Sequence, residues 1–110
     1  MIVVVKRGTY WLGPRWYIGR PSQLGNPFVI GRDGTREEVV EKYLHWFNAQ
    51  LEIEDSGVGR EFDRLVEFAR LVEFARANPR VGLECYCAPL ACHGDVIKAE
   101  LERHLKEVQS

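Results

Sequence analysis

Apolar residues occur along the chain in two kinds of arrangement, short continuous runs and longer periodic stretches. Residues 2–5 and 81–87 are continuous, mainly apolar runs, a pattern typical of strands that are buried on both faces. Three longer stretches, which begin near Thr35, Arg60 and Cys92, instead repeat apolar residues at helical spacing. The pattern therefore predicts two buried strands and three helices.

Between the first strand and the first helix, residues 8–34 are rich in glycine and proline. Such a density indicates turns and irregular loops, and the apolar residues within it favour short strands near residues 16–18 and 28–30. Strands that alternate with helices favour a mostly parallel sheet. We therefore predict a single α/β domain over residues 1–110, a small three-layer Rossmann-like fold with three or four strands and about three helices.

The first helix begins with a recognisable capping sequence. Thr35 is followed three residues later by Glu38, which is the spacing of a capping box, in which each side chain accepts a hydrogen bond from the other residue's amide. Apolar residues at helical spacing follow and predict the buried side of this helix: Val39, Val40, Tyr43, Leu44, Phe47 and Leu51.

The second helix, predicted over residues 60–77, contains the sequence LVEFAR twice in tandem, at residues 65–70 and 71–76. Six residues turn a helix by about 600°, so corresponding residues of the two copies point in different directions. Most apolar residues still share one wide arc, whereas Phe74 falls among charged residues. The width of the arc predicts packing on more than one side, by the domain itself and by a second subunit in a homodimer. The alternative is a slip duplication that the fold tolerates.

Composition and charge disfavour several classes of protein. The chain of 110 residues is 45% hydrophobic and 28% charged, with a formal net charge of −1, which is ordinary globular usage without the basic excess of a non-specific nucleic-acid binder. No apolar stretch approaches the ~20 residues of a membrane span, and the first residues do not have the form of a signal peptide. We therefore expect a cytoplasmic protein with no membrane partner, whose three cysteines are not in disulfides.

Residues 19–28, in the glycine-rich region, form the first candidate site. Arg20 supplies a planar guanidinium fork that suits a phosphate or a carboxylate. The other candidate ligand-binding residues of this loop are Gly19, Ser22, Gly25 and Asn26. A rigid loop of this composition is typical of anion or nucleotide recognition, although it matches neither the Walker A nor the GxGxxG motif. The alternative is an ordered turn with a structural role, in which Arg20 is solvated or paired with an acid.

Residues 85–95 form the second candidate site, because they hold all three cysteines of the chain and a histidine. Three alternatives are open for them. In the first, zinc is bound by a Cys3His set, composed of Cys85, Cys87, Cys92 and His93. In the second, Cys92 is a nucleophile or a thiolate contact, activated by a helix N-terminus and by His93 or His104. In the third, Cys85 and Cys87 are small core residues and Cys92 only caps the helix.

The start of the last helix adds two further candidates. His93, Gly94 and Asp95 follow directly after Cys92, and open backbone amides at the start of a helix attract anions. Gly94 is therefore a candidate ligand-binding residue even if the cysteines lie in the core. The candidate catalytic residues are Cys92, His93 and Asp95.

Taken together, the motifs IGRPSQLGNPF, at residues 18–28, and CYCAPLACHGDVI, at residues 85–97, resemble a known family, the small domain catalogued as domain of unknown function 4326. The resemblance spans nearly the whole chain. The family signature matches at Ile18, Gly19, Arg20, Pro21, Gly25, Asn26, Pro27, Phe28, Cys85, Cys87, Pro89, Cys92, His93, Gly94 and Asp95. The resemblance implies that both segments belong to one site. The predicted parallel sheet favours the same conclusion, because both segments follow strands and ligands gather at the carboxyl ends of such strands.

These features favour the binding of a nucleotide or another phosphate-containing small molecule, with transfer or hydrolysis at a sugar bond as the chemistry considered. Arg20 and the backbone of Gly19 and Gly25 would bind the anion. Asn26 and Ser22 would orient the ligand. No cofactor is established. Zinc belongs to the alternative of a non-catalytic module whose fold is stabilised by the metal and which binds protein or nucleic acid. A third alternative is an oligomeric structural adaptor that uses the second helix.

Overall fold

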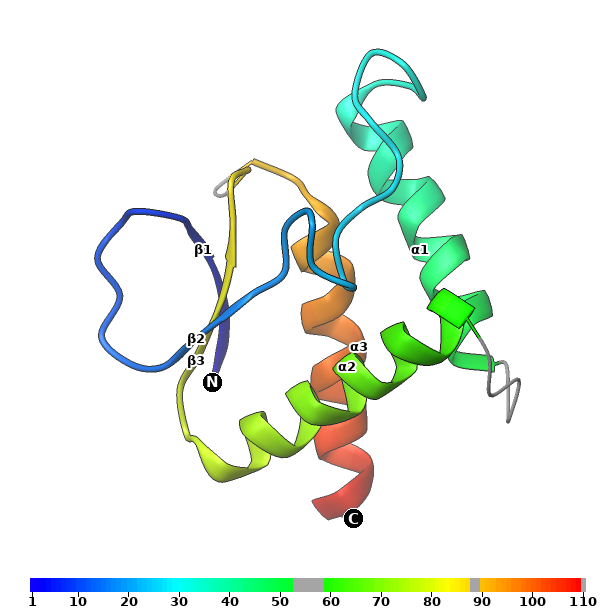
Figure 1. Cartoon of the computed structure of the whole chain (residues 1–110). Helices are drawn as coiled ribbons and strands as arrows, with labels where there is room; N and C mark the ends of the chain where they lie inside the picture. The colour runs from blue at the N-terminus through cyan, green and yellow to red at the C-terminus, as the bar shows by residue number, and fades with distance from the viewer. Residues whose placement is uncertain (53–58, 88–89, 110) are drawn as a thin grey trace.

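The computed structural model describes residues 1–52, 59–87 and 90–109, which form a small parallel sheet and three helices (Figure 1). The elements follow one another as β1 (Ile2–Lys6), β2 (Arg15–Tyr17), α1 (Arg36–Glu52), α2 (Gly59–Ala77), β3 (Val81–Cys85) and α3 (His93–Gln109). The predicted α/β class, with a parallel sheet and three helices, is confirmed. Among the helices of the described residues, none combines the length and the apolar character that crossing a membrane requires.

The central strand of the sheet is β3. The strand order is β1-β3-β2, and both pairings are parallel. Val81, Leu83 and Cys85 on one face and Gly82 on the other are buried, as expected for a strand with neighbours on both edges and both faces covered. The strand ends at Cys85, so the last two residues of the predicted run, Tyr86 and Cys87, lie beyond it.

The strand predicted near residues 28–30 is wrong, because local side chains take up the backbone amides that a sheet would need. The amide of Phe28 donates to the side-chain oxygen of Asn26 at 2.9 Å. The amide of Val29 donates to the carboxylate of Asp33 at 2.8 Å. Side chains that satisfy the backbone locally compete with sheet pairing, and this segment forms turns instead.

The two faces of the sheet are covered differently. All three helices lie on one side of it in Figure 1, where their apolar residues share a core with the strands. On the opposite face lies the loop between β1 and β2, and no helix of the described residues covers that face. Trp11 of this loop approaches Gly82 so closely that a Cβ on the glycine would lie 2.8 Å from the indole Nε1, which is why a residue without a side chain is needed there. On the same face, Glu84 forms ion pairs with Arg15 at 2.9 Å and with Arg7 at 3.5 Å.

Helix α1 begins as its capping sequence predicts. The Thr35 amide donates to the Glu38 carboxylate at 2.9 Å, and the Glu38 amide donates to the Thr35 hydroxyl at 3.2 Å. Of the predicted apolar positions, Val39, Tyr43 and Phe47 are buried, Val40 is half-buried, Leu44 is exposed and the Leu51 side chain lies outside the described part of the chain. The buried positions hold α1 against the core.

The two LVEFAR copies in α2 contact different parts of the domain. Phe68, in the first copy, is buried and packs edge-to-face against Phe47, with 5.3 Å between ring centroids. Phe74, in the second copy, is half-buried against Trp16 of β2, with 5.0 Å between centroids. The Trp16 indole also donates to Glu67 at 3.1 Å. The sheet therefore covers the position that the helical pattern places among charged residues, and the homodimer stays a prediction.

Candidate functional site

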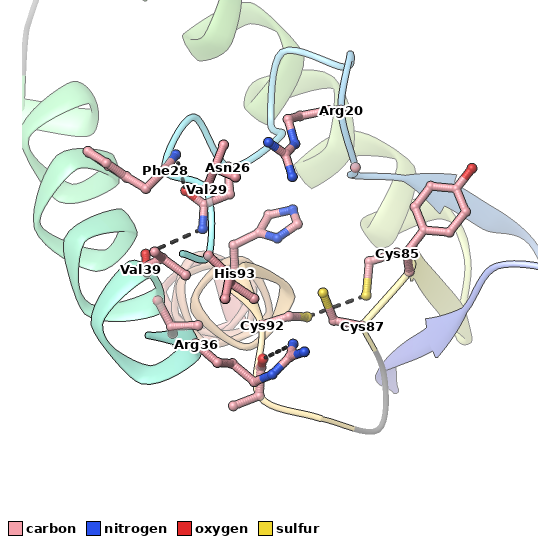
Figure 2. A pocket seen from close by; sticks show the side chains of 15 residues that line it. Arg20, Asn26, Phe28, Val29, Arg36, Val39, Cys85, Cys87, Cys92 and His93 are labelled. Atoms are coloured by element: carbon pink, nitrogen blue, oxygen red, sulfur yellow. Dashed lines mark hydrogen bonds between the residues drawn. The ribbon is translucent and has the colours of Figure 1, made fainter. Parts of the chain in front are cut away.

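A pocket of about 380 Å³ lies where β2 and β3 end and where α1 and α3 begin (Figure 2). Its wall comes from the loop after β2, the first turns of α1, the end of β3 with the residues that follow it, and the start of α3. Parallel strands present their carboxyl ends at one edge of the sheet, and the ligands of open α/β sheets bind there. The pocket therefore occupies the position at which this class of fold binds its ligands.

The structure brings the two candidate segments together in this pocket. The predicted site residues that line it are Gly19, Arg20, Asn26, Cys85, Cys87, Cys92 and His93. Figure 2 shows the Arg20 side chain extending from its loop towards the ring of His93. The predicted ligand-binding or catalytic residues that do not line the pocket are Ser22, Gly25, Gly94 and Asp95. Pro89 of the family signature lies outside the described residues.

Two of the predicted glycines serve close packing. A Cβ on Gly25 would lie 3.0 Å from the backbone of Arg20, and a Cβ on Gly94 would lie 3.0 Å from the side chains of Ile18 and Val4. Both glycines are buried. Gly25 therefore lets the loop fold back onto Arg20, while Gly94 lets the start of α3 lie directly on the sheet.

Ser22 helps to shape the loop from outside the pocket. Its amide donates to the carbonyl of Gly19 at 2.8 Å, which closes a turn around the two residues between them. Its hydroxyl is buried and has no hydrogen-bond partner in the described part of the chain. Within the described residues, then, this turn is stabilised by the backbone of Ser22 and not by its side chain.

The start of α3 uses its own polar groups internally. The carboxylate of Asp95 accepts a hydrogen bond from the Cys92 amide at 3.2 Å, and the Cys92 sulfur accepts one from the Gly94 amide at 3.3 Å. These contacts satisfy donors that the first turn of a helix otherwise leaves open. Fewer free amides are therefore left for an anion than the sequence predicts.

Two of the three thiols contact each other in the wall of the pocket. The sulfur atoms of Cys85 and Cys92 lie 3.3 Å apart, and the two residues are 1% and 3% exposed. The hydrogen bond with Cys85, together with burial, raises the pKa of the Cys92 thiol well above its ordinary value. Cys92 is therefore held as a neutral thiol, and this environment gives no support to its role as a thiolate nucleophile.

The arrangement of the cysteines and the histidine does not fit a zinc site. In the described part of the chain, no group of three or more histidine, cysteine, aspartate or glutamate side chains is placed to hold a metal ion. Two sulfurs bound to one tetrahedral zinc, each about 2.3 Å from the metal, would lie about 3.8 Å apart, whereas those of Cys85 and Cys92 are in closer contact. The ring nitrogen Nε2 of His93 is directed to a backbone carbonyl instead.

His93 is a buried histidine with one ring nitrogen anchored. Its Nε2 lies 2.6 Å from the carbonyl oxygen of Ile18, and its ring lies edge-on to Tyr43 with 5.1 Å between centroids. Burial lowers the pKa of His93, and the nearby Arg20 guanidinium lowers it further, whereas the Ile18 hydrogen bond and the Asp95 carboxylate oppose the shift. The imidazole is therefore neutral at pH 7.

The part of the pocket wall that the structure describes carries positive charge without a compensating acid. Arg20 and Arg36 both line the pocket, and no aspartate or glutamate does so among the described residues. In the same described part of the chain, neither guanidinium forms an ion pair, whereas Arg15 and Arg32 pair with carboxylates at 2.9 Å. Among the described residues, the one hydrogen-bond acceptor of the Arg36 guanidinium is the carbonyl of Ala91, at 3.3 Å. The electrostatics of the pocket therefore favour an anion.

Arg36 and the part of the apolar wall beyond the candidate loop 19–28 are not predicted by the sequence. Phe28, Val29, Val39 and Val40 form the apolar wall. The two α1 valines are recognisable as apolar helix positions, but nothing local marks them as facing a ligand. Arg36 has no local signal that distinguishes it from the other arginines of the chain. Asn26, which is a predicted ligand contact, uses its side chain structurally, because its amide donates to the Val39 carbonyl at 3.3 Å and its oxygen accepts from Phe28.

The fold and the site together define a small α/β domain with a cationic pocket at the carboxyl ends of its parallel strands. The family model described as a domain of unknown function, number 4326, matches residues 3–103. The chain therefore belongs to this family, as the two motifs predict. No curated protein and no solved structure matches the chain.

Proposed function

We propose that this domain binds a nucleotide or another phosphate-containing small molecule in the pocket between its two motifs. The observation that carries the proposal is the charge of the wall, where Arg20 and Arg36 occur without any acid among the described lining residues. The chain as a whole has a net charge of −1. The positive pocket is therefore a local arrangement and does not follow from composition.

Arg20 is built to receive an anion with little rearrangement. Its carbonyl accepts a hydrogen bond from the Tyr17 hydroxyl at 2.5 Å, and Gly25 packs on its backbone, while its side chain is exposed. A guanidinium binds phosphate oxygens through a planar fork of N–H groups. An anchored backbone lowers the cost of ordering this side chain when the ligand binds.

Arg36 adds a second cationic group from a different element. It lies at the start of α1, and among the described residues its guanidinium makes one hydrogen bond, to the Ala91 carbonyl at 3.3 Å. Because a guanidinium has five N–H donors, most of them stay available to a ligand. Figure 2 shows Arg20 and Arg36 on opposite sides of His93, so the two arginines favour a ligand that extends across the pocket.

The apolar wall indicates that the ligand has an apolar part in addition to its phosphate. Phe28, Val29, Val39 and Val40 line the same pocket, and its volume of about 380 Å³ lies within the range of small-molecule sites. Apolar side chains contact the faces of sugars and bases, while a few polar groups fix the orientation. A nucleotide or a sugar phosphate has both kinds of surface.

The reaction class that we propose for this pocket is transfer or hydrolysis at a sugar bond, with His93 rather than Cys92 as the polar group nearest the chemistry. A neutral imidazole is a competent proton acceptor, whereas the raised pKa of Cys92 keeps it protonated and poorly nucleophilic. Release of free adenine from AMP, followed by chromatography, checks this reaction class for one nucleotide. No release by the wild-type protein from AMP or from the other common nucleoside monophosphates would contradict it.

Calorimetric titration with ADP, AMP, inorganic phosphate and adenosine tests the binding proposal. We expect the phosphate-bearing compounds to bind and adenosine to bind more weakly than AMP. Arg20→Ala and Arg36→Ala should each weaken ADP binding by about tenfold to a hundredfold, which is the usual value of a charged hydrogen bond, while Arg20→Ala leaves the melting temperature nearly unchanged.

Arg70→Ala is the matched control, because Arg70 is exposed on α2 and does not line the pocket. It should leave the affinity for ADP unchanged. Equal affinities for adenosine and AMP, or an Arg20→Ala protein that binds ADP as well as the wild type does, would overturn the proposal. So would the absence of binding by every phosphate compound at millimolar concentration.

A further inference from the structure

His93 combines three properties that a merely structural histidine need not have. It lines the pocket, it is only 7% exposed, and it occupies the first position of α3. One of its ring nitrogens has a definite partner, the carbonyl oxygen of Ile18 at 2.6 Å. The other ring nitrogen, Nδ1, has no hydrogen-bond partner among the described residues.

The partner of Nε2 decides which nitrogen carries the proton. A carbonyl oxygen only accepts hydrogen bonds, so Nε2 must donate to Ile18. In a neutral imidazole the second nitrogen is then an acceptor with a free lone pair. Burial keeps the ring neutral, because it lowers the pKa of His93. His93, which lines the pocket, therefore has Nδ1 left as a hydrogen-bond acceptor.

The position of His93 relative to Arg20 restricts the class of ligand that the pocket can bind. Figure 2 shows the Arg20 guanidinium directed towards the His93 ring, and the residue that anchors the ring, Ile18, precedes Arg20 by two positions. A ligand whose phosphate is held by Arg20 therefore brings its neighbouring atoms to His93. In a nucleotide or a sugar phosphate these atoms are the carbons and hydroxyls of the sugar.

We infer that His93 is a specificity-determining ligand contact, whose Nδ1 accepts a hydrogen bond from a hydroxyl of a sugar phosphate that Arg20 holds by its phosphate. This inference rests on the proposed function and adds the class of ligand, a sugar phosphate with a free hydroxyl close to its phosphate. The apolar wall is then left for the more distant part of the ligand, such as a base.

The experiment compares ligands that differ in one hydroxyl, with two variants that separate the two ring nitrogens. Ribose 5-phosphate and 2-deoxyribose 5-phosphate, and AMP and 3′-deoxy-AMP, are titrated calorimetrically into the wild-type protein. In at least one pair we expect the hydroxylated ligand to bind about tenfold more tightly, because its absence leaves the Nδ1 acceptor unpaired.

His93→Gln and His93→Asn are a matched pair of variants. A glutamine amide can still donate to Ile18 but places no acceptor where Nδ1 lies, so His93→Gln should lose the preference for the hydroxylated ligand. An asparagine oxygen can take the place of Nδ1 but cannot reach Ile18. His93→Asn should therefore keep part of the preference and lose stability. Nitrogen NMR shifts of the free wild-type protein check the Nε2–H tautomer without any ligand.

The failures of the two proposals are distinguishable. If no phosphate compound binds, or if Arg20→Ala changes nothing, the proposed function fails. If binding depends on Arg20 but neither pair of ligands is discriminated, the phosphate site stands and the role of His93 is overturned. A preference that persists in His93→Gln, or an NMR spectrum with the proton on Nδ1, would overturn that role as well.

Discussion

The two motifs that meet in the pocket differ in how far their polar groups are already engaged. The loop after β2 anchors its backbone and presents the Arg20 side chain to solvent without a carboxylate partner among the described residues. In the segment around the start of α3, Cys92 contacts Cys85, Gly94 and Asp95. The segment with more reactive residue types is therefore the one whose groups mainly bind one another.

This difference shows that a reactive residue type in a sequence is not necessarily free to bind a ligand in the folded protein. A thiol, a carboxylate and a helix N-terminus are each able to bind or react, but Cys92 and Asp95 use these properties to cap α3 and to join it to β3. His93 is the member of the segment with one nitrogen engaged by Ile18 and the other free of partners among the described residues. The segment is therefore mainly a structural junction, and His93 is its pocket-lining residue with a ring nitrogen that has no partner in the described part of the chain.

The largest expected effect comes from breaking the junction at Gly94. A Cβ there would already lie 3.0 Å from Ile18 and from Val4, so Gly94→Val should lower the free energy of unfolding by about 3 kcal/mol through overpacking. Urea denaturation measures this loss. Ala99→Val, at an exposed position of the same helix, is the control and should change stability by less than about 0.5 kcal/mol. Similar losses in the two variants would mean that the start of α3 is not packed on the sheet.

A smaller effect is expected from the thiol contact. Cys85 is 1% exposed on the central strand and touches Cys92, whereas Cys87 is half-buried at the pocket. Cys85→Ser brings a hydroxyl into this apolar contact and should cost about 1–2 kcal/mol. Cys87→Ser should cost clearly less in the same denaturation experiment. Equal stability of the two serine variants would contradict the prediction that the buried thiol of Cys85 contributes more to stability than the half-buried thiol of Cys87.

The smallest expected effect is the dependence of stability on pH that His93 contributes. Its pKa in the folded protein is lowered by burial, and Arg20 and Asp95 act on it in opposite directions. Below the unfolded pKa of about 6.5, the unfolded chain takes up a proton that the folded state resists, so stability falls as the pH falls and is highest above that value. Denaturation between about pH 7.5 and 5.5 should show this slope in the wild type.

Two histidine variants test whether His93 causes the change of stability with pH. His93→Gln should show a shallower dependence on pH, because the titrating group has been removed. His45→Gln, at an exposed position of α1, should keep the wild-type dependence. An unchanged slope in His93→Gln would show that the ring is not held neutral in the folded domain.

Most of the fold could be predicted from local patterns. The continuous apolar runs mark β1 and β3, and the Thr35–Glu38 capping box marks the start of α1 with the hydrogen bonds that its spacing predicts. The extra strand near residues 28–30 was predicted wrongly because Asn26 and Asp33 cap its amides. Apolar content alone does not reveal such side-chain competition.

The candidate site could be predicted only in part. The two motifs identify Arg20 and His93, which both line the pocket. They also suggest Gly94 and Asp95, which lie outside it. Arg36 was not predicted, because nothing in its own neighbourhood distinguishes it from the other arginines of the chain.

The sequence by itself determined the order and type of the main elements and the family to which the chain belongs, because periodicity, capping and motif spacing are properties of neighbouring residues. Only the tertiary structure decided which polar groups are engaged and which face the pocket. Cys85 meets Cys92 across a turn, His93 is anchored by Ile18 from 75 positions away, and Arg36 reaches the pocket from another element. A charge or a hydrogen-bonding group becomes a binding site through the partners that it has or lacks, and those partners come from distant parts of the chain.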